Sequence, residues 1–200
     1  MQPQPIHDQA KGRILLKIAR SAIAHALKVN DGNDDSIDKT AQWLVEPGAT
    51  FITLTKNGQL RGCIGSLLAH QSLIKDVSSN AVSAALRDTR FQPVTVNEWK
   101  YIKIEVSLLS ALQPITFVNE ADALAQLRPG IDGVMFEYGI YRSTFLPQVW
   151  DSLPRPEEFM AQLKMKAGLY PDFWDDAIQL SRYTIQKWRE TDFIEEKSHG

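Results

Sequence analysis

The chain has 200 residues, a formal net charge of −2 and 44% hydrophobic residues, which are ordinary values for a globular protein with one substantial core. The near-neutral charge argues against a nucleic-acid binder, because such proteins usually present a basic face. A single cysteine excludes an internal disulfide and a zinc site built on paired cysteines. The polar N-terminus and the lack of a long apolar run predict no signal peptide and no membrane span, so we expect a cytoplasmic protein.

The N-terminal part predicts one long helix followed by an acidic loop. Apolar residues recur at helical spacing from Ile14 to Ala26, and Asp8 is placed to cap the helix. The sequence NDGNDDS at 30–36 then ends this pattern. Its glycine is the third residue and no glutamate follows at the spacing of a calcium loop, so calcium binding is not expected.

The segment FITLTKNGQLRGCIGSL, residues 51–67, predicts a β-hairpin. Asn57-Gly58 is a strong turn signal, because a type I′ turn needs positive φ at both central residues. An unbroken register from that turn gives the pairs Lys56–Gln59, Leu54–Arg61 and Ile52–Cys63. Arg61 and Cys63 would then share one face of the sheet. The other face would carry Leu60, Ile64 and Phe51.

The rest of the chain alternates between helical and extended patterns. The predicted elements are a helix from Ser72 to about Leu86, a strand over 101–110, a short helix ended by Pro129, a hairpin over 133–147 turning near Gly139, and two closing helices that begin with Pro156 and Pro171. The cations Arg182, Lys187 and Arg189 are interpreted as a solvated helix face. This mixture predicts an α+β fold, with an antiparallel-rich sheet flanked by helices.

These segments also carry a resemblance to a known family. GATFITLTKNGQLRGCIGSL, NAVSAALRDTRFQP, IEVSLLS, PGIDGVMFEYG and FLPQVW occur in this order, and RGCIG after a hairpin turn is the hallmark of the AMMECR domain family. The chain resembles that family over about residues 10–190, and it is similar to the prokaryotic members called AmmeMemoRadiSam system protein A. The resemblance supplies no reaction.

The resemblance implies one compact α+β domain over residues 1–200, with two unequal lobes. A boundary between the lobes is expected near residues 111–130, although the composition does not shift there. The resemblance also implies a groove at the segment from Arg61 to Gly65. The partners that it implies are a Memo-like protein and a radical SAM protein.

Cys63 is the first candidate functional residue. A lone cysteine is often a buried small apolar residue, but Gly62 and Gly65 would let another backbone or a ligand approach closely. Arg61, on the same predicted face, would favour the thiolate. One hypothesis therefore makes Cys63 a nucleophile or acceptor in a groove with Arg61, Gly62, Gly65 and Ser66, and simple packing is the other.

A second group of candidates lies in NAVSAALRDTRF, which holds Asn80, Asp88 and Arg90. One hypothesis joins Arg90 and Arg61 in a two-guanidinium clamp for a carboxylate or phosphate. The alternative is helix-end chemistry, in which Asp88 accepts from local amides and Arg90 pairs with an acid. Glu105, on the polar face of the next strand, is a candidate to accept from Arg61.

Proton transfer beside the thiol would fall to a carboxylate. Glu105 is the candidate general base near Cys63, and Asp88 is the second candidate; a solvated strand face is the alternative for Glu105. Gln148 follows a strand end, where side chains commonly project into clefts. A dyad of Cys63 with His70 is not favoured. No metal-ligand or phosphate-binding motif is found, so no metal and no cofactor are expected.

Two functions follow as hypotheses. In the first, the chain is an enzyme in which Cys63 takes part in covalent group transfer or protein modification. Arg61 and Arg90 would then bind an anionic part of the substrate, while Glu105 or Asp88 carries protons. In the second, the chain is a non-catalytic binding or regulatory module whose groove docks a protein segment or a small anionic ligand. The residues leave this choice open, and they predict no nucleic-acid or membrane partner.

Overall fold

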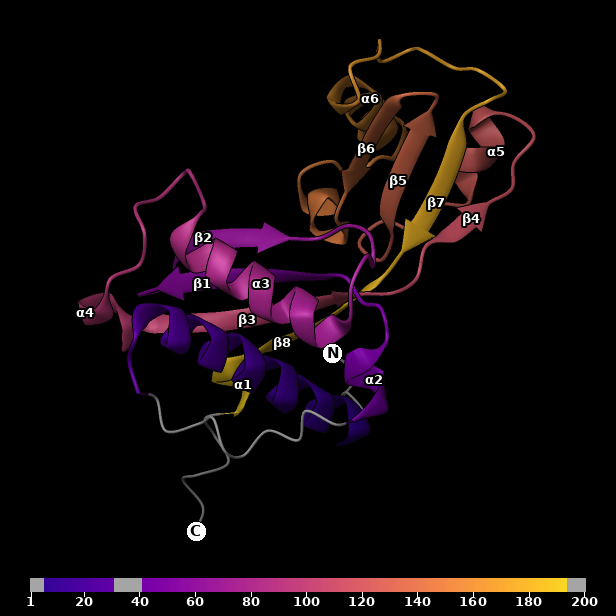
Figure 1. The fold of residues 1–200 in the computed structure, drawn as a ribbon. Coiled ribbons are helices and arrows are strands. Elements are labelled where there is room, and N and C mark those ends of the chain that lie inside the picture. Colours follow the sequence, from indigo (N-terminus) through magenta and orange to yellow (C-terminus); the bar gives the residue numbers. More distant parts are fainter. Residues whose placement is uncertain (1–5, 31–40, 194–200) are drawn as a thin grey trace. The chain divides into compact units, whose positions relative to one another are not determined.

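The structure is a computed structural model that describes residues 6–30 and 41–193, with the side chains of residues 6–8 excepted (Figure 1). The first helix begins at Ile6, so Asp8 lies inside it and the prediction that Asp8 caps it is wrong. The acidic loop after Asn30 lies outside the described part. The chain divides into two compact units. Unit 1 comprises Met1–Leu109 with Gln186–Gly200, and unit 2 comprises Ser110–Ile185.

Unit 1 is a four-stranded sheet with two helices on one of its faces, and its strand order is β2-β1-β3-β8. Figure 1 shows α1 and α3 side by side in front of this sheet. The elements are α1 (Ile6–Leu27), α2 (Gln42–Val45), β1 (Thr50–Lys56), β2 (Gln59–Gly65), α3 (Leu73–Leu86), α4 (Val96–Trp99), β3 (Ile102–Leu109), β8 (Ile185–Arg189) and the 3-10 helix η3 (Glu190–Phe193).

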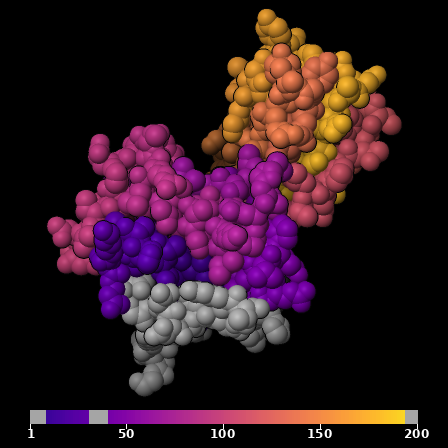
Figure 2. All heavy atoms as spheres, viewed as in Figure 1, coloured from indigo at the N-terminus to yellow at the C-terminus, as the bar shows by residue number. Residues whose placement is uncertain are grey.

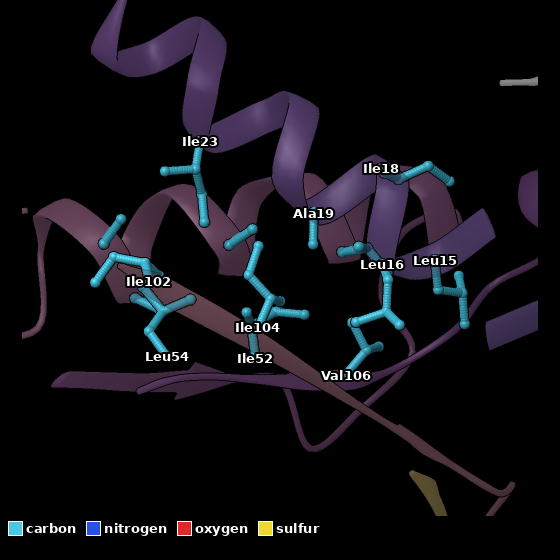
Figure 3. Close-up of a cluster of buried hydrophobic side chains, with 14 of the residues drawn as sticks. Leu15, Leu16, Ile18, Ala19, Ile23, Ile52, Leu54, Ile102, Ile104 and Val106 are labelled. Atoms are coloured by element: carbon cyan, nitrogen blue, oxygen red, sulfur yellow. The ribbon is translucent and has the colours of Figure 1, made fainter. Parts of the chain in front are cut away.

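The core of unit 1 lies between the helices and one face of the sheet. Alternate residues of β1 and β3 point toward α1, as Figure 3 shows for Ile52 and Ile104 beneath Ala19 and Ile23. Each of these four side chains is at most 1% exposed. A fully buried aliphatic side chain contributes roughly 1.5–3 kcal/mol, so this layer supplies much of the stability of unit 1.

The hairpin turn lies where the sequence predicts it. Asn57 and Gly58 have φ values of 52° and 78°, and Lys56 pairs with Gln59. Positive φ at both central residues is the condition of the type I′ turn. The prediction of the turn is therefore confirmed.

The register beyond the turn differs from the prediction, because a β-bulge interrupts it. The shift falls between Leu54 and Thr55, so that Leu54 pairs with Gly62 and Arg61 is the extra residue of β2. Cys63 consequently pairs with Thr53. The prediction that Cys63 pairs with Ile52, and that Phe51 and Ile64 share a face, is wrong. Ile64 packs against the core, while the opposite face carries Phe51, Thr53, Cys63 and Gly65.

Unit 2 is a second four-stranded antiparallel sheet, in the order β4-β7-β5-β6. Its core is built on aromatic packing, with the Trp150 and Phe159 rings stacked at 3.8 Å between centroids. The predicted hairpin near Gly139 is the β5–β6 pair. The elements are β4 (Gln113–Ile115), α5 (Glu120–Ala125), β5 (Gly133–Tyr138), β6 (Tyr141–Phe145), the 3-10 helix η2 (Pro147–Asp151), α6 (Pro156–Lys166) and β7 (Gln179–Tyr183).

The helix predicted from Pro171 is wrong, because that part of the chain forms strands β7 and β8. Proline followed by acidic residues is also the pattern of a helix N-terminus, and this caused the wrong prediction. From Ile178 and Leu180 onward, apolar and polar residues alternate, which is the pattern of a strand. One strand belongs to each of the two sheets. Arg182 therefore lies on β7, and Lys187 and Arg189 lie on β8, so the prediction that these cations form a helix face is wrong.

The mixture of helices and antiparallel strand pairs confirms the predicted α+β fold class. Among the described helices, none is long and apolar enough to cross a membrane.

We predict that Ile104→Ala lowers the free energy of unfolding by about 3 kcal/mol, because it opens a cavity under α1. Urea denaturation followed by tryptophan fluorescence measures this change. The control is Val96→Ala, whose side chain is 55% exposed and whose effect should stay within about 0.5 kcal/mol. Equal effects of both substitutions would contradict the assigned core.

Candidate functional site

The face of the unit 1 sheet that points away from α1 and α3 carries the thiol; we call it the open face. Cys63 of β2 pairs with Thr53 of β1, which pairs in turn with Glu105 of β3. The Thr53 hydroxyl donates to the Cys63 sulfur over 3.5 Å. Glu105 is two strands from Cys63, or about 10 Å at ordinary strand spacing. It shares a face with the thiol but is too distant to take its proton directly.

Glu105 is held by two cations of β8. Its carboxylate accepts from Arg189 Nε at 2.6 Å and lies 3.3 Å from Lys187 Nζ. The prediction that Glu105 accepts from Arg61 is therefore wrong. The reason is the wrong assignment of the C-terminal segment, since β8 pairs beside β3 and brings its own cations to this carboxylate.

The two glycines of RGCIG allow other parts of the same chain to pack closely against β2. A Cβ on Gly62 would lie 2.2 Å from the carbonyl oxygen of Ala84, so β2 approaches the backbone of α3 directly. A Cβ on Gly65 would lie 2.3 Å from the Phe51 ring. The prediction that another backbone approaches a glycine is confirmed at Gly62, and both positions have a structural reason for glycine.

The backbone of Cys63 is bound by Asp88 and Arg90, which follow the end of α3. The Cys63 N–H donates to Asp88 Oδ2 at 2.8 Å, and the Cys63 carbonyl accepts from Arg90 Nη2 at 3.1 Å. Arg90 also donates to Asp88 at 2.9 and 2.7 Å. Since β2 is an edge strand, these two side chains take the place of a neighbouring strand at this residue.

The electrostatics of this pair follow from its geometry. The hydrogen bond from Arg90 holds the pKa of the Asp88 carboxyl well below its usual range, against an opposing effect of burial. Asp88 therefore stays ionised at neutral pH. The hypothesis of helix-end chemistry, with Asp88 on local amides and Arg90 on an acid, is confirmed.

Arg61 is bound by Glu98, a residue that the sequence interpretation missed. Arg61 Nε and Nη2 lie 3.3 and 3.2 Å from the Glu98 oxygens, and Lys56 Nζ lies 2.8 Å from the same carboxylate. Arg61 and then Lys56 lower the pKa of Glu98 to about 2. The sequence signal that could have drawn attention to Glu98 is its spacing from Thr95, with which it forms a capping box at the start of α4.

The two guanidinium groups share an aromatic neighbour. The Phe91 ring centroid lies 6.0 Å from Arg61 Cζ and 5.5 Å from Arg90 Cζ. Each arginine is nevertheless neutralised by its own carboxylate, Glu98 or Asp88. The pair is thus brought near one ring but not left open as a clamp for an anion.

Asn80 and Ser66 belong to a buried network that the sequence did not predict. Asn80 Nδ2 donates to Ser66 Oγ and to the Thr50 carbonyl, both at 3.0 Å. Asp76, only 1% exposed, accepts from the backbone and the hydroxyl of Thr50 at 2.8 and 2.7 Å. The network joins α3 to β1 and to the residue after β2, and it is a structural role for Asn80.

The remaining candidates are two exposed polar residues. Gln148 is exposed on η2 of unit 2, and His70 is exposed in the loop after β2. Within residues 6–30 and 41–193, no group of three or more His, Cys, Asp or Glu is placed to hold a metal ion. The structure thus gathers Arg61, Gly62, Cys63, Asp88 and Arg90 at the β2 edge, with Glu105 two strands away.

Comparison with known proteins gives one consistent result. The family model described as AMMECR1 matches residues 16–188. A protein of Methanothermobacter thermautotrophicus is 38% identical, covering 90% of this chain and 94% of its own, and protein MJ0810 of Methanocaldococcus jannaschii is 34% identical, covering 91% of each. The crystal structure of the uncharacterized protein PH0010 from Pyrococcus horikoshii has a TM-score of 0.75 at 33% identity, over 90% of this chain and 91% of that one.

We predict that Glu98→Gln lowers stability by about 2 kcal/mol at neutral pH, because the charged hydrogen bonds to Arg61 and Lys56 are weakened. The folded-state pKa of about 2 lies below the ordinary 4.5, so this stabilisation is fully present above pH 4.5 and is lost as the pH falls toward 2. Urea unfolding at a series of pH values measures the difference between the two proteins. A difference that persists unchanged at pH 2 would contradict the assignment.

Proposed function

The chain belongs to the AMMECR1 family, and on that premise we propose that it is a non-catalytic binding module whose contact surface is the open face around Cys63. The observation that carries this proposal is that three carboxylates of unit 1 are already bound to arginines within the chain. Asp88 is bound to Arg90 and Glu98 to Arg61. Glu105 is bound to Arg189.

Asp88 and Glu98 are poorly suited to acid–base catalysis at the thiol. A general acid or base works best when its pKa lies near the operating pH. The pKa values of Asp88 and Glu98 are instead displaced downward, so both are weak bases at neutral pH. These observations favour the binding hypothesis over the enzyme hypothesis, in which Cys63 accepts or transfers a group.

The open face suits a protein segment as its ligand. Phe51, Thr53 and Cys63 are half-buried, and Lys103 and Arg189 add exposed charge on the other two strands. A rigid sheet holds these groups at fixed spacing, which lowers the ordering cost of binding. Strand addition at Cys63 is blocked by the Asp88–Arg90 pair, so contact is made by side chains of this face.

The partners are named only by family resemblance. A Memo-like protein and a radical SAM protein from the same organism are the candidates, and a cytoplasmic location, where the thiol stays reduced, belongs to the same proposal. Co-purification of the three proteins, followed by isothermal calorimetry with each purified partner, tests it.

We predict that Thr53→Arg weakens binding to the Memo-like protein at least tenfold, because it places a bulky charge at the centre of the open face. Cys63→Ala should change the dissociation constant by less than about threefold, since a small contact is lost and no chemistry is needed. The control is Val96→Arg in α4, at a side chain that is 55% exposed. It should leave the affinity unchanged.

The enzyme hypothesis makes a different prediction for the same proteins. Mass spectrometry of the partners, and of this chain, after incubation would reveal a covalent product that depends on Cys63. Such a product, abolished in both Cys63→Ala and Cys63→Ser while the affinity is retained, would overturn the binding-module proposal.

A further inference from the structure

A groove of about 760 Å³ lies between α1 and α3, on the outer side of the helical layer and thus on the opposite side of the sheet from Cys63. Figure 2 shows the atoms of α1 (indigo) and α3 (purple to magenta) side by side on the face toward the viewer. Each helix contributes a stripe at helical spacing, such as Ile18, Ala22 and His25 on α1. The groove has the volume of a binding site and is separate from the open face.

The charge of this groove is of one sign. Lys75 and Arg87 line it and are exposed, and the residues that line it include no carboxylate, although the whole chain carries a net charge of −2. Within the described part of the chain, neither cation has an ion-pair partner. Lys75 lies in the first turn of α3, where the helix dipole disfavours a cation. Its position therefore does not serve the stability of its own helix.

The floor of the groove is apolar and its centre is lined by small residues. Ile74 and Val82 of α3 are half-buried, and they lie two turns apart. Ser78 of α3, and Ser21 and Ala22 of α1, also line the groove. Small side chains allow another helix to approach closely, because interaxial distance depends on the side chains at the contact.

The spacing of the cations selects the kind of ligand. Lys75 and Arg87 are twelve residues apart on α3 and its C-cap, which is about 18 Å at the helical rise of 1.5 Å per residue. One phosphate or carboxylate group does not reach both. A helix of about three to four turns that carries acids along its flanks does reach both while its apolar stripe covers Ile74 and Val82.

We propose that the α1–α3 groove docks an acidic amphipathic helix of a partner protein. Apolar residues of that helix lie on the floor, and its carboxylates pair with Lys75 and Arg87 at the two ends. This surface is independent of the open face, so the inference goes beyond the proposed function and does not rest on it.

The probe is a fluorescein-labelled peptide of eighteen residues, with leucine at i, i+3, i+4 and i+7 and glutamate on the flanks. Its affinity for the full chain is measured by fluorescence anisotropy at low and high salt. We expect binding that weakens with salt and that falls at least tenfold in Lys75→Glu/Arg87→Glu. The matched control Lys100→Glu/Arg155→Glu makes the same change in net charge at exposed cations outside the groove, and its affinity should stay within twofold.

Three outcomes would overturn this inference: equal binding of a peptide with lysine in place of glutamate, equal loss in the control variant, or no binding of the acidic peptide. Amide chemical-shift mapping locates the contact. Shifts at Ala22, Ser78 and Val82 support the groove, whereas shifts confined to Thr53 and Cys63 refute it. Thr53→Arg should leave this affinity unchanged, so failure here is distinguishable from failure of the open-face proposal.

Discussion

The contact between β2 and the C-terminal end of α3 positions the rest of the candidate site. Gly62 brings the strand against the Ala84 carbonyl, and a Cβ there would lie only 2.2 Å from that oxygen. One residue later, Asp88 and Arg90 bind the N–H and the carbonyl of Cys63. The edge strand is therefore fixed to the helix by packing and by charged hydrogen bonds within two residues.

This constraint gives the RGCIG segment a structural meaning. Gly62 packs against the backbone of α3, and Gly65 packs against the Phe51 ring. The arginine binds Glu98, and the cysteine side chain lies on the open face. Asp88, which the sequence offers as a candidate for proton transfer, binds the backbone of this strand. Two surfaces of unit 1 remain as binding candidates. One is the open face around the thiol, and the other is the cationic groove between α1 and α3 on the opposite side of the sheet.

Much of the fold follows from local patterns in the sequence. The site depends on a β-bulge and on a long-range strand pairing, which local patterns do not predict. The 3.6-residue period of α3, the Asn57-Gly58 turn and the alternation of β3 predict their elements correctly. The bulge at Leu54 is not visible in the sequence, yet it shifts every pairing beyond it and leaves Arg61 as the unpaired extra residue of β2. The cations that bind Glu105 come from β8, some eighty residues away, and only the tertiary pairing of that strand brings them there.

The central claim is that Asp88 and Arg90 hold the edge of β2 by binding the backbone of Cys63. Hydrogen exchange at the Cys63 amide, compared between the wild type and Asp88→Asn, tests this most directly. The account predicts a protected amide in the wild type and exchange at least tenfold faster in the variant, because a neutral amide oxygen is a weaker acceptor than a carboxylate and no longer pairs with Arg90. Equal protection of the Cys63 amide in both proteins would contradict it.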